Sequence, residues 1–289
     1  MGTLSEFSKG LEEAVMKAGT STVLVDARQR FPASGIAMAP DLVLTAEHVV
    51  TRDTGLRVRT AEGKSVAATI AGRDPGSDLA VLRVDEKVLS PAVRSSSPAK
   101  VGQLVLALGR PGEDGIQASW GIVTAIGGPT RTGRGGLLEK YLQTETTPYP
   151  GFSGGPLVDT EGEVLGLNTS GLTRGGSLTI PIDVAWPIAD ALATHGSVKR
   201  GYLGVRTQPV ELPDGSTGVL ILWAEDAGPA ASAGLLVGDI IMAIAGREIR
   251  DSDDVFSALT GATVGKPVDV SISRGGRLQN VQVKVGERK

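Results

Sequence analysis

The chain has 289 residues, which is long for one domain and sufficient for two with sizeable cores. Its 29 basic and 32 acidic residues leave a net charge of −3 without a basic block, so nothing points to a nucleic-acid footprint and we expect no nucleic-acid partner. No apolar run approaches the ~18 residues of a membrane span, and the absence of cysteine excludes disulfides and thiolate metal sites. We therefore expect no transmembrane segment, no metal and no cofactor.

The first twenty residues are expected to form a separate helical segment. They lack the basic start and apolar core of a signal peptide. Leu11, Val15 and Ala18 share one helix face, and the pattern predicts a helix that begins with Ser8 as its cap and stops at Gly19.

Residues 21–196 are predicted to form one β-rich domain. Short, regularly spaced apolar runs bounded by turn residues favour barrels or sandwiches over alternating βα units. A helix capped by Asp183, with Pro187 in its first turn, is predicted to close this domain at Gly196. The expected strands are STVLV, GIAMAP, LVLTA, GLRVRT, SVAATI, LAVLRV, QLVLALG, GIVTAI, PLVD and VLGLN.

Residues 201–287, after a linker at 197–200, are predicted to form a second, smaller domain. GYLGV, GVLILWA and DIIMAIAGREI are expected strands, and DSDDVFSALTG is expected to be a capped helix ending at Gly261. Two alternating runs around Gly275 and Gly276 predict a hairpin.

The stretch YPGFSGGPLVD, Tyr149 to Asp159, places Ser153 among glycines. One interpretation is a simple turn. The other is a nucleophile with main-chain N–H groups exposed beside it, which requires a base and a group that orients the base.

The chain offers two histidines as the base. His195 lies at the end of a predicted helix, where a cation is favoured by the helix dipole. His48, in LVLTAEHVV, follows a buried strand, and a structural role is the alternative for it. Asp78 directly precedes an apolar strand, where a buried carboxylate needs a hydrogen-bonding partner, whereas Asp74 is typical of a turn.

A histidine after a strand, an aspartate before a strand and then GFSGGPL, in this order, resemble the chymotrypsin-like serine proteases, and more narrowly the HtrA (Deg) family. The similarity extends to QTETTPYPGFSGGPLVD, GIVTAI, TIPID and RGYLGV, and so covers nearly the whole chain from Thr22 onward. The resemblance implies a mainly β fold, with a chymotrypsin-like double β-barrel followed by a small β-rich PDZ domain.

In this family the matching motifs make His48 the base, Asp78 the orienting acid and Ser153 the nucleophile. Gly151 is expected to turn the backbone so that its own N–H and that of Ser153 stabilise the oxyanion. Glu47 and Phe152 depart from the residues usual in the family. These departures leave an alternative, a proteolytically silent, chaperone-like or scaffold protein that binds peptide C-termini.

The specificity pocket is predicted by counting and by neighbouring apolar residues. Thr147 stands six residues before Ser153, where a trypsin-like enzyme has an aspartate. Together with Tyr149, Ile180 and Ile182, it predicts walls for a small to medium apolar side chain. Plain strand core is the alternative for the two isoleucines.

The loop GYLGV resembles the PDZ loop that captures a C-terminal carboxylate with successive main-chain N–H groups while the peptide adds as a strand. We therefore expect peptides with apolar C-termini to bind, although core packing is the alternative for the apolar side chains. The expected site comprises Tyr202, Leu203, Gly204, Val205, Val255 and Leu259.

Residues 127–136 form a glycine-rich stretch with Arg131 and Arg134. A phosphate-binding loop is excluded because no strand–loop–helix context follows; the resemblance implies a sensor loop. It further implies an ATP-independent serine endopeptidase of protein quality control and stress response that degrades unfolded proteins. A homotrimer with Phe7 near the contact, and a periplasmic or otherwise extracytoplasmic location, are also implied.

Overall fold

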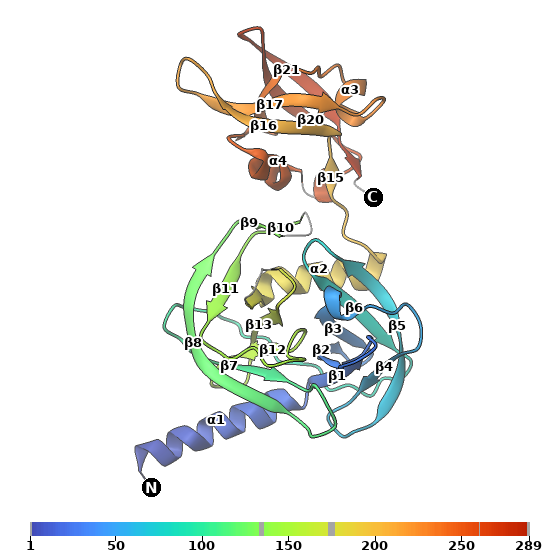
Figure 1. Cartoon of the computed structure of the whole chain (residues 1–289), viewed down its shortest axis with the longest axis vertical. Helices are drawn as coiled ribbons and strands as arrows, with labels where there is room; N and C mark the ends of the chain where they lie inside the picture. The colour runs from blue at the N-terminus through green and yellow to red at the C-terminus, as the bar shows by residue number, and fades with distance from the viewer. Residues whose placement is uncertain (1, 133–135, 173–176, 260, 288–289) are drawn as a thin grey trace. The chain divides into compact units, whose positions relative to one another are not determined.

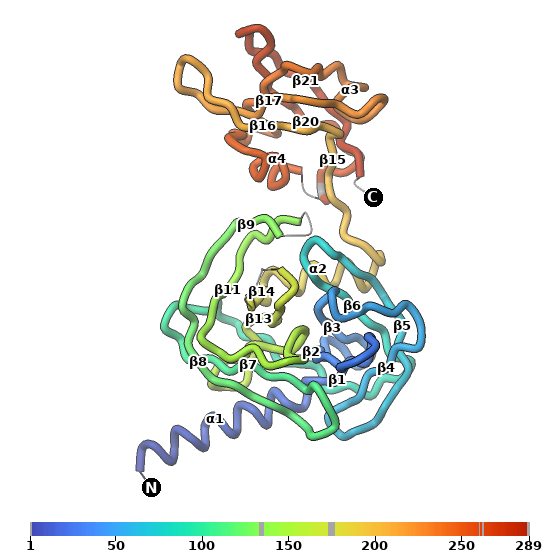
Figure 2. Tube along the Cα trace, viewed as in Figure 1, coloured from blue at the N-terminus to red at the C-terminus, as the bar shows by residue number. Residues whose placement is uncertain are grey.

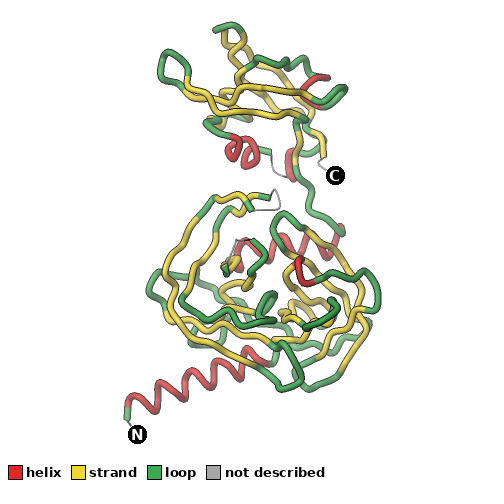
Figure 3. The backbone as a smooth tube through the Cα atoms, viewed as in Figure 1, coloured by secondary structure: helices red, strands yellow, loops and turns green. Residues whose placement is uncertain are grey.

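The structure is a computed structural model that describes residues 2–132, 136–172, 177–259 and 261–287. The chain divides into two compact units, Met1–Val198 and Lys199–Lys289. Strands predominate in both units, which confirms the mainly β fold class (Figure 3). None of the helices in the described ranges is long and apolar enough to cross a membrane.

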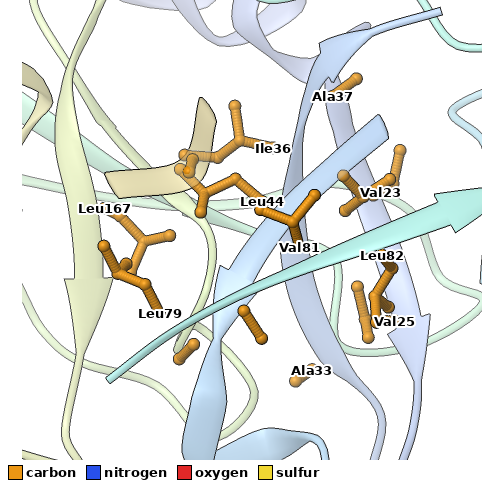
Figure 4. Close-up of a cluster of buried hydrophobic side chains, with 14 of the residues drawn as sticks. Val23, Val25, Ala33, Ile36, Ala37, Leu44, Leu79, Val81, Leu82 and Leu167 are labelled. Carbon is orange, nitrogen blue, oxygen red and sulfur yellow. The ribbon is translucent and has the colours of Figure 1, made fainter. Parts of the chain in front are cut away.

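The first unit contains a closed barrel of antiparallel strands in the order β1-β2-β3-β6-β5-β4 (Figure 1). Buried side chains of its strands fill the barrel, and Leu167 of the second barrel belongs to the same cluster (Figure 4). The shared core therefore fixes the edges of the two barrels against each other. The strands are β1 Thr22–Asp26, β2 Ala33–Ala39, β3 Leu42–Ala46, β4 Leu56–Arg59, β5 Ser65–Asp74 and β6 Leu79–Val84.

A second closed barrel follows, in the order β11-β14-β13-β12-β7-β8, which confirms the double-barrel prediction. Every expected strand overlaps an observed one. The two-residue strands β9 and β10 form a separate small sheet, and their sequences are too short to show a period. The bounds are β7 Leu104–Gly109, β8 Gln117–Gly127, β9 Thr130–Arg131, β10 Leu137–Leu138, β11 Tyr141–Thr144, β12 Pro156–Val158, β13 Val164–Thr169 and β14 Leu178–Pro181.

The first helix is longer than predicted. Helix α1 spans Thr3–Gly19, and Gly2 rather than Ser8 precedes its first turn. Ser8 was wrongly expected as the cap: it lies inside the helix, where its hydroxyl donates to Glu12 Oε1 at 3.1 Å. The residues 3–7 contain no glycine or proline, so the helix extends back to Thr3.

Helix α2, Ile182–His195, ends the first unit. Asp183 lies in its first turn and accepts from Lys140, so its expected capping role is wrong; Pro181 occupies the cap position. Gly196 ends the helix in the left-handed conformation, with φ 77°.

The second unit is built on a sheet in the order β16-β17-β18-β20-β21, with β19 paired to β18 and a separate β15–β22 pair. Asp251 caps helix α4, accepting from the amides of Asp253 and Asp254, but the helix ends at Ala258, before the predicted Gly261. The expected hairpin is present, with φ 56° and 78° at its two glycines.

The remaining elements of the whole chain are η1 Glu47–Val49, β15 Gly201–Tyr202, β16 Val205–Glu211, β17 Thr217–Ala224, α3 Pro229–Ser232, β18 Ile240–Ile244, β19 Arg247–Glu248, α4 Ser252–Ala258, η2 Gly261–Thr263, β20 Pro267–Arg274, β21 Arg277–Lys284 and β22 Gly286–Glu287.

An ion pair between the buried Asp239 and the partly exposed Arg274 holds the start of β18 against β20. The side chain of Asp239, 2% exposed, accepts from Arg274 Nε and Nη2, each at 2.7 Å, and from the Leu236 amide at 2.8 Å. The hydrogen bonds from Arg274 hold the pKa of Asp239 below its ordinary value. The charged form therefore stabilises the folded unit above the unfolded pKa of about 3.9, and that contribution is lost as the pH falls through the lowered folded value.

Replacing Asp239 with asparagine is expected to destabilise the second unit by about 1–2 kcal/mol at pH 7, because the charge-assisted hydrogen bonds between the buried carboxylate and the partly exposed Arg274 are lost. Amide hydrogen exchange of β18 and β20 in the full chain measures this loss. Asp226→Asn, at an exposed position, is the control. The difference between wild type and Asp239→Asn should shrink below about pH 4; equal exchange at pH 7 would contradict the assigned role.

Candidate active site

His48 lies on a short turn at the end of a buried strand. Strand β3 ends at Ala46, and the 3-10 turn η1 then turns the chain so that His48 faces a cleft. The His48 side chain is 16% exposed. A strand end buried in the barrel core therefore holds the imidazole at the barrel surface.

Asp78 is fully buried at the start of β6 and has a left-handed backbone, with φ 57°. This conformation is unfavourable for a non-glycine residue by roughly 1–2 kcal/mol. The main chain holds it in place, because the Glu47 amide donates to the Asp78 carbonyl at 2.9 Å. Asp74 shapes the preceding turn by accepting from the Gly76 amide, the Ser77 amide and the Ser77 hydroxyl.

The carboxylate of Asp78 is aligned with the ring of His48. Nδ1 of His48 lies 2.8 Å from Asp78 Oδ2 and 3.0 Å from Oδ1, and the His48 amide donates to Oδ1 at 2.9 Å. The Thr169 hydroxyl also donates to Oδ2. These contacts favour the tautomer with the proton on Nδ1, which leaves Nε2 as the acceptor.

Gly171 packs closely over this pair. A Cβ at this position would lie 2.5 Å from His48 Nδ1 and 2.6 Å from Asp78 Oδ2. Only glycine fits this approach, so Gly171 shields the contact between the carboxylate and the imidazole.

Ser153 lies in a tight turn just before β12. Gly151 has φ 87°, a conformation that favours glycine. The Phe152 amide donates to Tyr149 O at 3.1 Å, whereas the amides of Gly151 and Ser153 donate to no acceptor among the described residues. The turn therefore leaves available the two N–H groups that were predicted to stabilise an oxyanion.

The hydroxyl of Ser153 is paired with a neighbouring serine in this structure. Its Oγ lies 3.1 Å from Ser170 Oγ and accepts from the Ser170 amide at 3.4 Å. His48, Ser153 and Ser170 line the same cleft of about 420 Å³. The side chain of Phe152, by contrast, is buried in the core of the second barrel, which explains a large apolar residue at this position.

Of the four residues predicted to form the specificity pocket, the structure brings only Tyr149 to the cleft. Ile180 is fully buried in the core, and Ile182 starts α2 and packs against that core. Thr147 is exposed, and its main chain is bonded to Ser119. Counting along the sequence and apolar character do not show which side chains face the cleft, so Thr147, Ile180 and Ile182 are wrongly predicted as its walls.

Several polar residues that line the cleft, and one that contacts the buried Asp78 carboxylate, are not predicted from the sequence. Thr169 is the last residue of the apolar strand β13 and Ser170 follows it, and this position at a strand end is the signal that could have pointed to them. The segment 28–31 between β1 and β2 adds the basic residues Arg28 and Arg30 to the lining of the cleft. Burial lowers the pKa of Arg28. The other polar lining residues are Gln29, Thr146, Asn168 and Ser177.

The predicted peptide site of the second unit lies around the start of β16. The amides of Leu203 and Gly204 donate to no acceptor within the described part of the chain, and Gly204 has φ 75°. Leu203, Val255 and Leu259 belong to the buried core of the unit, with Val205 packed against it. Tyr202 precedes them on β15.

The predicted sensor loop is described only at its two ends, because Arg134 lies outside the described residues. Arg131 is on β9. The Thr132 hydroxyl donates to Gly76 O at 2.8 Å and accepts from the Gly136 amide at 3.0 Å. The loop is thus attached to the turn that presents Asp78. His195, the other histidine, lies at the end of α2 and does not line the cleft.

Both domains match known families. Residues 33–167 match the trypsin-like peptidase domain, and residues 201–285 match the PDZ domain. Two relatives, each named a probable periplasmic serine endoprotease DegP-like, are 37% identical in Pseudomonas putida strain F1 and 36% identical in Halomonas elongata. Each match covers 88% of this chain, which spans 55% and 56% of these relatives.

Solved structures agree over a larger share of the chain. The HtrA-type protease AlgW with a decapeptide matches with a TM-score of 0.83 at 27% identity, covering 96% of this chain and 99% of that chain. A serine endoprotease from Yersinia pestis matches with a TM-score of 0.82 at 29% identity, covering 96% and 98%. Agreement in both domains and in their order shows that the chain belongs to the HtrA (Deg) family, as its motifs predicted.

Proposed function

We propose that this protein is an ATP-independent serine endopeptidase that degrades unfolded proteins in quality control. The observation that carries the proposal is the buried Asp78 carboxylate aligned with His48 Nδ1, in the cleft that also holds Ser153. Such an arrangement activates a serine for acyl transfer. The relatives' names support a periplasmic or otherwise extracytoplasmic location.

In the proposed reaction, Ser153 Oγ rotates away from Ser170 toward Nε2 of His48 and attacks the peptide carbonyl. His48 takes the serine proton and then gives it to the leaving amine, while Asp78 stabilises the imidazolium. The amides of Gly151 and Ser153 stabilise the oxyanion, an effect worth roughly 3–4 kcal/mol for each donor. Water then hydrolyses the acyl-enzyme by the reverse sequence.

Degradation of an unfolded protein tests this function. Casein incubated with the purified protein in the absence of ATP should yield small fragments, whereas a folded substrate such as native ribonuclease should remain intact. Intact casein would contradict the endopeptidase and favour the silent, chaperone-like alternative.

The second unit is proposed to bind peptide C-termini through the amides of Leu203 and Gly204. Peptides ending in an apolar residue should bind, and C-terminal amidation should weaken them about 10- to 100-fold because charge-assisted hydrogen bonds are lost. Calorimetric titration of the Ser153→Ala protein measures this without cleavage. Equal affinity for the acid and the amide would show that the amides of Leu203 and Gly204 do not bind the C-terminal carboxylate.

A homotrimer, which the family resemblance implies, is proposed with its contact where α1 meets β8, because aromatic side chains remain exposed there. Phe7 and Trp120 make an edge-on contact at 6.4 Å, although they are 44% and 61% exposed, and Leu4 and Ile122 beside them in sequence are also exposed. A second copy of the chain would cover this surface.

Phe7→Glu together with Trp120→Glu is therefore expected to convert the trimer into a monomer, as measured by sedimentation velocity. Met16→Glu is the matched control, because Met16 is 73% exposed and lies nine residues from Phe7, half a turn around α1. An unchanged sedimentation coefficient in the double variant would contradict the proposed contact.

A further inference from the structure

Ser34 is a fully buried serine on β2, at the boundary between the two barrels. Strand β2 is in contact with β7 of the second barrel (Figure 2), and β7 pairs with β12, the strand that follows the Ser153 turn. Buried hydroxyl groups in a strand lose hydration, so their hydrogen-bond partners indicate what they hold in place.

Both polar groups of Ser34 that can donate are directed to the turn of Ser153. Its hydroxyl donates to Gly151 O at 2.7 Å, and its amide donates to Ser153 O at 3.2 Å. The two carbonyls flank Phe152, so one residue of the first barrel holds the nucleophile turn of the second barrel at two points.

These bonds complete the restraint of two peptide groups. The peptide that joins Gly151 to Phe152 is held at its carbonyl by Ser34 Oγ and at its amide by Tyr149 O. The peptide that joins Ser153 to Gly154 is held at its carbonyl by the Ser34 amide and at its amide by Asn168 O. The unbonded amides of Gly151 and Ser153 border these fixed peptides.

The hydroxyl is itself fixed by a third group. Ser34 Oγ accepts from the Arg110 amide at 2.8 Å, and the Arg110 guanidinium donates to Thr22 O at 2.9 Å and to Gly19 O at 3.1 Å. The oxygen thus donates one hydrogen bond and accepts another, and its orientation toward Gly151 is determined.

We propose that Ser34 is a positioning residue of the nucleophile turn, which orients the Gly151 and Ser153 amides toward the oxyanion. The inference rests on the proposed serine endopeptidase function and assigns a role to a residue outside the Ser–His–Asp constellation. Ser34 acts on the transition state through the turn and contacts no substrate. Loss of its hydroxyl should therefore impair oxyanion stabilisation more than ground-state binding.

The test compares two ligands of the same sequence, a peptide boronic acid ending in valine and the corresponding valine amide. The boronate forms a tetrahedral oxyanion on the serine, whereas the amide binds without one. Ser34→Ala should weaken the boronate about 10- to 100-fold and change binding of the amide less than about threefold, since loss of a whole donor costs about 10²–10³ in kcat. With a peptide substrate, kcat should fall and KM should stay nearly constant.

Ser21→Ala is the matched control. Ser21 is also a buried serine of the first unit, and its hydroxyl donates to Ala18 O at 3.0 Å, at the end of α1. We expect this variant to keep the wild-type preference for the boronate. Circular dichroism establishes that each variant is folded, and if Ser34→Ala is not, Ser34→Cys should show a smaller loss of the same preference.

The outcomes separate the two proposals. A wild-type protein that binds the boronate no more tightly than the amide would overturn the endopeptidase function and the role of Ser34 with it. A wild type that prefers the boronate, with a folded Ser34 variant that retains the full preference, would overturn the role of Ser34 alone. Equal weakening of both ligands would also overturn it, because Ser34 would then support only the general structure of the cleft.

Discussion

Replacing Ser153 with alanine is expected to abolish casein cleavage, with a loss of about 10⁶ in kcat. The variant removes the attacking oxygen. It leaves the turn intact, because the turn is held by main-chain groups: the Ser34 amide donates to Ser153 O, and the Gly154 amide donates to Asn168 O. His48→Ala should cost nearly as much, because the residues act as a unit and their losses are not additive.

Initial rates of casein cleavage measure both variants, and circular dichroism confirms that they fold. His195→Ala is the control, since it removes the other histidine of the chain, at the end of α2. We expect wild-type rates for it. Full activity in Ser153→Ala, or a loss in His195→Ala that matches the loss in His48→Ala, would contradict the assignment.

Replacing Asp78 with asparagine should lower kcat about 10⁴-fold. The carboxylate of Asp78 accepts from His48 Nδ1, from the His48 amide and from the Thr169 hydroxyl, and an amide cannot accept all three. An asparagine that donates to Nδ1 would stabilise the wrong tautomer, with the proton on Nε2. The expected result is a large fall in kcat with a small change in KM.

Steady-state kinetics with a peptide substrate separate kcat from KM for this variant. Asp53→Asn serves as the control, because Asp53 forms an exposed ion pair with Arg73 on the surface of the same barrel. A fall in kcat of less than tenfold in Asp78→Asn would show that His48 does not depend on this carboxylate for its tautomer.

The sequence predicted a double barrel followed by a PDZ domain. The short strands indicated a β-rich fold, and the order of the motifs indicated the family with this architecture. His48 follows β3, Asp78 precedes β6 and Ser153 precedes β12, so each motif is local and readable. Their approach in space depends on the packing of two barrels, and the sequence indicated it only through the family resemblance.

Contacts between distant strands could not be read from local patterns. The sequence near the TIPID motif predicts Ile180 as a pocket wall, but every residue of β14 is buried and Ile180 lies in the core. Ser34 showed no signal at all, since a small residue in an apolar strand is typical of plain core. Its role depends on Gly151, which is 117 residues away in sequence.

The most direct test of the central claim is labelling with a fluorophosphonate, which reacts with an activated serine, followed by mass spectrometry of the peptides. We predict an adduct on Ser153 in the wild-type protein, a strongly reduced adduct in His48→Ala and none in Ser153→Ala. A folded wild-type protein whose Ser153 stays unmodified, under conditions that label trypsin completely, would contradict the claim that Ser153 is an activated nucleophile.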